Sequence, residues 1–221
     1  MADEHTHDHD HEHEHAHDHD HEHAHDHEHA HDDEHEHDHD APADRALEQE
    51  RARIRRQALA QIRQYPDVAL RMKAREVTEF DDFLIQLVER MQHLMHDAQG
   101  VGLAATQLGV LQRIFIFEPE GEVGHAVINP RIIESSDEKL TEEEGCLSMG
   151  EVRVPVERSN KVTLEGKDPS GVEVRFELEG LSARVVQHEY DHLDGVLILD
   201  RTDPEHRKQA LGELRPQPTL V

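Results

Sequence analysis

Two histidines four residues apart, with a glutamate directly after the first, form the pattern in this chain with the most immediate chemical use. Residues 187–192 read QHEYDH, and a helix would place His188 and His192 on one face, where both imidazoles can bind one metal ion. Glu189 could act on water at that ion without being a ligand. Cys146 is the only cysteine, and its thiolate would supply a third ligand and leave one position open. Closed four-ligand sites are structural, so these residues predict a catalytic metal site.

Two further segments specify the class of enzyme. Residues 100–107 read GVGLAATQ, and residues 144–148 read EGCLS. Together with HEYDH at 188–192, their order and separations resemble the motifs of the peptide deformylases, metalloenzymes that remove the formyl group from the first methionine of new bacterial proteins. The resemblance extends from about Tyr65 to about Asp200. It implies a hydrolase whose substrates are the N-formylmethionyl peptides of nascent chains.

The resemblance also implies how the motif residues share the reaction. Besides the three ligands, Glu189 would take a proton from water and deliver it to the leaving amine. The tetrahedral oxyanion that forms from the formyl carbonyl needs hydrogen-bond donors already aimed at it. The resemblance implies two of them, the side-chain amide of Gln107 and the backbone N–H of Leu147.

Three further residues are candidates for substrate binding. The resemblance implies that the peptide backbone approaches closely at Gly102, which only a small residue allows, and that Arg153 helps to hold the peptide. Val185, one turn before the first histidine, could line a pocket for the methionine side chain or could be an ordinary core residue. Many relatives have an apolar residue and then proline after the cysteine motif, whereas this chain has Met149 and Gly150. This departure concerns side-chain preference at the rim and leaves the reacting groups intact.

The donor set restricts the metal without deciding it. One thiolate and two imidazoles accept zinc, iron, nickel or cobalt. The resemblance implies ferrous iron as the most active physiological metal, with zinc as a weaker substitute.

Two other functions fit parts of the pattern. A zinc endopeptidase built on the same histidine pair would take a third His or Glu ligand further along the chain, but the only later histidine is His206, in a polar C-terminal segment. A metal-storage protein would use the histidine-rich N-terminus and would bind many ions without needing Glu189. Comparing formylated with unformylated peptides as substrates distinguishes a deformylase from an endopeptidase. The number of metal ions bound per chain distinguishes an enzyme from a storage protein.

The first 40 residues differ sharply in composition from the rest. They contain 17 of the 50 acidic residues, 17 of the 23 histidines and no Lys or Arg, and histidine alternates with Asp, Glu, Thr or Ala through most of the segment. After Met1 no large apolar side chain is present to offset the entropy of ordering, so the segment is predicted to be a disordered tail. It is either a solvated acidic tail or a low-specificity binder of additional divalent metals, since imidazole and carboxylate suit many of them.

The remaining 181 residues carry 33 acidic and 23 basic side chains, a formal charge of −10. Such an acidic surface argues against specific nucleic-acid binding, although a small arginine cluster at residues 51–56 leaves a ribosome contact open. No stretch approaches the length of a membrane span, and the N-terminus lacks the pattern of a signal peptide. With one unpaired cysteine, the sequence predicts a cytoplasmic protein that does not contact a membrane.

The elements that would position the site follow from periodicity and turn signals. Helices are expected from Pro42 to about Arg63 and from an N-cap at Thr78 to Gly100. Strands are expected at residues 113–117 and 126–133, an acidic loop at 142–144, a hairpin at 161–167 and 172–179, and a short final strand at 196–199. Ser182 is expected to cap the helix that carries the histidine pair and stops at Gly195.

Strands that precede and surround a central metal-binding helix indicate an α+β fold with mixed or antiparallel pairing, and the resemblance implies the same. We therefore expect a tail at 1–40, a helical extension at 41–64 and a catalytic domain at 65–221.

Overall fold

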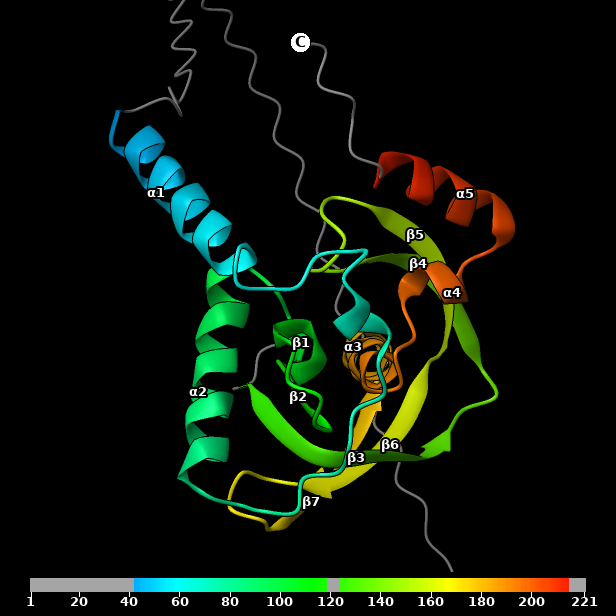
Figure 1. The fold of residues 1–221 in the computed structure, drawn as a ribbon. Helices are drawn as coiled ribbons and strands as arrows, with labels where there is room; N and C mark the ends of the chain where they lie inside the picture. Colours follow the sequence, from blue (N-terminus) through cyan, green and yellow to red (C-terminus); the bar gives the residue numbers. More distant parts are fainter. Residues whose placement is uncertain (1–41, 119–123, 215–221) are drawn as a thin grey trace, which may run out of the picture. The chain divides into compact units, whose positions relative to one another are not determined.

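Helix α3 (Gly180–Leu193) occupies the centre of the fold and carries both histidines of the metal pattern. The computed structural model describes residues 42–118 and 124–214, and the predicted tail at 1–40 lies outside these residues. In Figure 1 the other elements surround α3, with strands on several sides of it. Helix α3 contacts β1, β2, β5, β6 and β7, so its side chains meet residues from both sheets.

The larger sheet has five antiparallel strands in the order β1-β2-β3-β6-β7. The strands are β1 (Gly102–Ala104), β2 (Ile114–Phe117), β3 (His125–Ser135), β6 (Lys161–Lys167) and β7 (Glu173–Glu179). A second sheet pairs β4 (Lys139–Gly145) with β5 (Arg153–Ser159), also antiparallel. The expected strands at 113–117 and 126–133 and the expected hairpin are confirmed, and the α+β class is confirmed with antiparallel pairing in both sheets.

The remaining helices cover the outside of these sheets. Helix α1 (Pro42–Leu59) contacts α2 (Asp82–Asp97), which packs on β1 and β2, while α4 (Ile198–Arg201) and α5 (Pro204–Glu213) pack on β5. Two short 3-10 helices, η1 (Val68–Arg71) and η2 (Ala105–Leu108), lie in the connections. Among the described helices, none is long and apolar enough to cross a membrane.

The core follows from the apolar stripe of α2. The six stripe residues expected from the sequence are all buried: Leu84, Leu87, Val88, Met91, Leu94 and Met95. They pack with residues of β1 and β2 in one cluster, and α3 packs against residues of β1, β2, β3 and β6 in a second. Each fully buried side chain of this size contributes about 1.5–3 kcal/mol, so the stripe anchors the helix that precedes the glycine-rich motif.

The N-cap expected at Thr78 is wrong. Asp81 caps α2, because its carboxylate accepts a hydrogen bond from the backbone N–H of Leu84 at 3.0 Å. Aspartate accepts a hydrogen bond from a free N–H of the first turn, and its negative charge is stabilised by the positive end of the helix dipole. Helix α1 ends at Leu59, four residues before the expected end at Arg63.

Three expectations near the metal motifs are also wrong. Residues 142–144 belong to strand β4 and do not form a loop. Ser182 lies inside α3, because Gly180 takes a φ of +59° that lets the chain pass from β7 directly into the helix. Residues 196–199 do not form a strand, because α4 begins at Ile198 and the Asp200 carboxylate accepts a hydrogen bond from the Leu197 N–H at 2.9 Å, in the manner of a helix cap.

Candidate metal centre

Helix α3 and the end of β4 bring the three predicted ligands together. The imidazole rings of His188 and His192 lie on one face of α3 with centroids 5.0 Å apart. Cys146 follows Gly145, the last residue of β4, and its Sγ lies 3.3 Å from Nε2 of His192. The three ligand atoms all lie within 4.8 Å of one another, and within the described ranges no other group of His, Cys, Asp or Glu meets this criterion.

The donor atoms fit a divalent transition metal. Metal–sulfur bonds of about 2.3 Å and metal–nitrogen bonds of about 2.0 to 2.1 Å place ligand atoms at separations of this order. Cys146 and His192 are buried and His188 is nearly so, and burial lowers the pKa of His192 well below its ordinary value. His192 is therefore a neutral imidazole, the form that binds metal. A thiolate with two imidazoles suits zinc, iron, nickel or cobalt.

Glu189 is buried beside the ligands with little to hold its charge. Only 4% of it is exposed, and its Oε2 has no hydrogen-bond partner among the described residues. Burial raises the pKa of Glu189 to about 7, so its carboxyl can exchange a proton near neutral pH. Gly102 makes room for it, since a Cβ at that position would clash with the Glu189 carboxylate and lie 2.9 Å from Val185.

Gln107 is held with its amide nitrogen toward the centre. The backbone N–H of Ala104 donates to Oε1 of Gln107 at 2.9 Å, which fixes which end of the amide is oxygen. Nε2 of Gln107 then donates to Oγ of Ser148 at 3.0 Å and lies 3.7 Å from Sγ of Cys146. The amide nitrogen therefore lies beside the cysteine ligand, next to the loop that holds Leu147.

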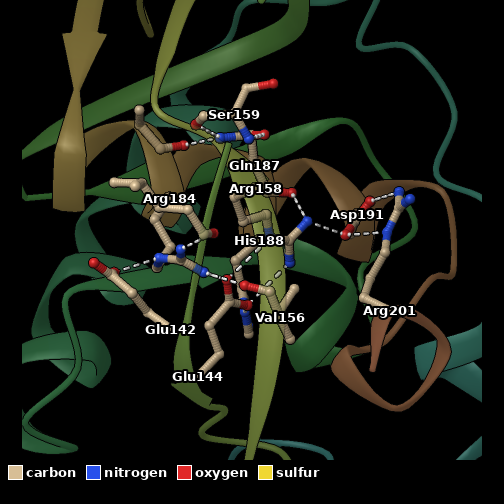
Figure 2. A network of polar contacts seen from close by, with 12 residues as sticks. Glu142, Glu144, Val156, Arg158, Ser159, Arg184, Gln187, His188, Asp191 and Arg201 are labelled. Atoms are coloured by element: carbon tan, nitrogen blue, oxygen red, sulfur yellow. Dashed lines mark hydrogen bonds and ion pairs between the residues drawn. The ribbon is translucent and has the colours of Figure 1, made fainter. Parts of the chain in front are cut away.

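A buried carboxylate behind the histidine pair was not found from the sequence. Glu144 is 5% exposed, and its Oε2 lies 3.0 Å from Nδ1 of His188. Arg158 donates to both oxygens of Glu144 at 3.0 Å, and Arg184 donates to Oε1 at 2.7 Å. Figure 2 shows this carboxylate between the two guanidinium groups and the His188 ring. Glu144 thus fixes the ring, with its other nitrogen left for the metal.

The ionic network continues on both sides of Glu144. Arg158 also donates to Oδ2 of Asp191 at 2.5 Å, and Arg201 donates to the same carboxylate through Nε at 3.0 Å. Arg184 reaches Glu142, whose side chain is about half exposed, at 2.8 Å (Figure 2). Three acidic and three basic side chains therefore balance in this network, which keeps the buried charges near the metal centre paired.

The pKa of Glu144 reports the strength of this pairing. Burial alone would raise the pKa, but the hydrogen bonds and charges of His188 and Arg158 outweigh burial and lower it from 4.5 to about 2. The carboxylate is therefore ionised at any pH at which the protein works.

A cavity of about 360 Å³ opens beside the metal centre. Its wall includes Glu189 and Leu147, and also the two residues expected to bind substrate, Gly102 and Arg153. Val185 lines the same cavity, as expected of a residue that contacts the methionine side chain. It is also only 8% exposed, so it packs in the core as well. Helix α1 also contributes to this cavity, which the sequence did not indicate.

Within the described ranges, no histidine outside the motif joins the group of metal ligands. His96 pairs with Glu118 at 3.0 Å, and His206 contacts Asp203, the residue that caps α5. The third histidine ligand that a zinc endopeptidase would need is therefore not supplied by His206.

Comparisons with known proteins agree with this geometry. Residues 59–208 match the family model for polypeptide deformylase. The chain is 48% identical over 146 residues to a peptide deformylase of Thermotoga neapolitana, covering 66% of this chain and 88% of the relative. It is 45% identical over 161 residues to peptide deformylase 1 of Corynebacterium glutamicum, covering 72% and 95%.

Solved structures give the same result. The crystal structure of peptide deformylase from Thermotoga maritima matches with a TM-score of 0.63 and 48% identity, covering 65% of this chain and 97% of that one. A peptide deformylase from Legionella pneumophila matches with a TM-score of 0.66 and 37% identity, covering 69% and 91%.

Proposed function

The chain belongs to the polypeptide deformylase family, and we propose that the family's reaction takes place at Cys146, His188 and His192. The protein is a hydrolase that removes the N-formyl group from the N-terminal methionine of newly synthesised proteins. The observation that carries the assignment to these residues is the convergence of three ligand atoms beside the buried Glu189.

Each residue at the centre has a separate part in this proposal. A divalent cation held by the three ligands would lower the pKa of a water ligand toward ~7 and so supply hydroxide at neutral pH. Glu189 takes the proton from the attacking water and passes it to the nitrogen as the formyl C–N bond breaks. Formate and the free amine are the products. The Gln107 amide and the Leu147 N–H stabilise the oxyanion, and losing one such donor costs on the order of 10²–10³ in rate.

The cavity wall supplies the binding surface for the peptide. We place the methionine side chain against Val185 and Leu181, two apolar residues one turn apart on α3. Arg153 lies at the cavity over Gly145, where a Cβ would be 3.6 Å from its Cγ. From there its guanidinium can hydrogen-bond the peptide beyond the methionine.

Amine release from a formyl-methionyl tripeptide tests the proposal. We expect rapid turnover by the chain with ferrous iron under anaerobic conditions, and none with the same tripeptide carrying a free amine. Cleavage of an internal bond of the unformylated peptide would instead support an endopeptidase. No turnover with metal shown to be bound would contradict the proposed reaction.

The physiological metal is proposed to be ferrous iron. The proposal rests on the family and on a mixed sulfur and nitrogen donor set that accepts iron as well as zinc, nickel and cobalt. Metal analysis of protein purified without oxygen tests it, together with turnover after reconstitution with each ion.

We further propose that the tail at 1–40 binds additional divalent metals and supplies the centre. Its support is composition, because 17 histidines alternate with acidic residues there. We expect a chain lacking residues 1–40 to match the full chain when metal is plentiful and to lose activity sooner during competition with a chelator. A full chain with the tail histidines replaced by asparagine is the matched control and should behave like the deletion. Equal activity of all three forms under chelation would contradict the supply role.

The substrate also suggests where the protein acts. Nascent N-formylmethionyl chains and a single unpaired cysteine support a cytoplasmic location. A ribosome contact through the arginines of α1 is a further proposal, and co-sedimentation of the chain with ribosomes, with and without residues 41–58, would test it.

A further inference from the structure

The segment between α1 and η1 is hydrogen-bonded to both motifs that carry the oxyanion donors. The backbone N–H of Arg63 donates to the carbonyl oxygen of Gln107 at 2.7 Å. Two residues later, the N–H of Tyr65 donates to the carbonyl oxygen of Ser148 at 2.8 Å. One short segment therefore spans the distance between the glycine-rich motif and the cysteine motif.

Gln64 lies between these two residues, and its side chain contacts Leu147, the residue that carries the second proposed donor. Its Nε2 donates to the carbonyl oxygen of Leu147 at 2.9 Å and to that of Ile62 at 3.2 Å. Two acceptors on one amide nitrogen fix the orientation of the Gln64 amide. The carbonyl that it holds belongs to Leu147, the residue whose N–H is the second proposed donor.

These contacts close a ring of hydrogen bonds. Gln107 donates through Nε2 to Oγ of Ser148 at 3.0 Å, and Ser148 and Gln107 both accept from the segment at 63–65. The ring sets the spacing of the two donors, one on η2 and one just after the cysteine ligand. Spacing matters because donors must lie about 2.7–3.1 Å from the position that the oxyanion will occupy. A displacement of 1 Å can lower the rate by about 10²-fold.

We propose that Gln64 is a positioning residue for this oxyanion site, acting through the backbone of Leu147. The inference rests on the proposed function, since it needs Leu147 and Gln107 as the donors. Gln64 lines the cavity, so a bound peptide would cover its amide and shield its hydrogen bond to Leu147 from water.

The exposure of Gln64 allows a positioning role to be told apart from a structural one. Gln64 is an exposed residue whose described contacts are the two hydrogen bonds to carbonyls, so its replacement removes little packing. A change in rate without a change in stability would therefore report the position of the donor.

The test compares Gln64→Met, which keeps length but has no donor, with Gln64→Lys, which restores a donor. Gln61→Met is the control, because Gln61 is exposed on the same segment and accepts from Arg90 at 3.3 Å away from the centre. We expect Gln64→Met to lower kcat about three- to tenfold, the factor that one net hydrogen bond supplies. KM, bound metal and Tm should stay within error of the wild type. Gln64→Lys should recover most of kcat, and Gln61→Met should equal the wild type.

A tetrahedral analogue gives a second readout. A peptide with a phosphonate in place of the formyl group should bind Gln64→Met more weakly by the factor lost in kcat, while the product amine binds equally. Unchanged kcat in Gln64→Met, or a loss that Gln64→Lys does not recover, would overturn the inference. Gln107→Ala belongs in the same assay. Full turnover in that variant would show that Gln107 is not an oxyanion donor and would contradict the proposed function itself.

Discussion

Glu189→Gln is expected to keep its active-site metal and to lose turnover by about 10²–10⁴, the range for removal of a general acid and base. Glutamine has the same shape, so the tight space beside Gly102 is still filled. It cannot accept a proton from water or return one to the leaving amine. Because Glu189 is not one of the three ligands, metal content should equal that of the wild type.

Metal content, kcat and KM should be measured on the same preparation of the Glu189 variant. Glu179→Gln is the matched control, since it changes an exposed carboxylate at the start of α3 that pairs with Lys161 at 3.0 Å. We expect the control to retain wild-type kcat. Full activity in Glu189→Gln would sink the proposed mechanism, and loss of metal would mean that Glu189 belongs to the coordination sphere.

Spacing and residue type were enough to predict a set of ligands whose members lie together in the structure. A helix with histidines at i and i+4 and a lone cysteine predicted the ligand set, and α3 and the end of β4 bring these three residues together. This convergence could be predicted because the pattern depends on local helix geometry for two of its members. Gln107 and Leu147 came only from the family resemblance, because nothing in their spacing relates η2 to the cysteine motif.

The supporting residues could not be predicted, because they depend on strand register and on tertiary contacts. Three glutamates in a row suggested a solvated loop, yet strand alternation in β4 turns Glu144 inward while Glu143 stays exposed. Arg158 reaches it from β5 through a register that the sequence does not specify. Gln64 is similar, since its contact to Leu147 joins residues 83 positions apart.

Glu144→Gln is expected to destabilise the fold and to weaken metal binding. The amide would remove the carboxylate that the buried Arg158 and Arg184 share, leaving Asp191 and Glu142 as their remaining charged partners. Removing one member of a buried ion pair costs about 3–5 kcal/mol. Loss of the carboxylate behind His188 should lower metal affinity about 10- to 100-fold. Glu142→Gln, at the exposed end of the same network, is the control and should cost less than about 1 kcal/mol.

The same ion pairing predicts how the stability of the fold changes with pH. The pKa of Glu144 is lower in the folded protein, about 2, than its ordinary 4.5. Its contribution is therefore fully present above about pH 4.5 and is lost as the pH falls toward 2, and the shift corresponds to about 3 kcal/mol. Urea unfolding of the metal-free protein at several pH values should show the wild type and Glu144→Gln converging in acid and separating toward neutral pH.

Glu144→Asp separates folding from metal binding if the glutamine variant does not fold. The shorter carboxylate still neutralises Arg158 and Arg184, but it withdraws from Nδ1 of His188, which now lies 3.0 Å away. We expect stability near that of the wild type, with weaker metal binding measured by competition with a chromogenic chelator. Cobalt substitution adds a spectroscopic readout, because a freed imidazole changes the coordination geometry and with it the visible spectrum. Wild-type affinity and an unchanged cobalt spectrum would mean that β4 and α3 hold His188 without help from Glu144.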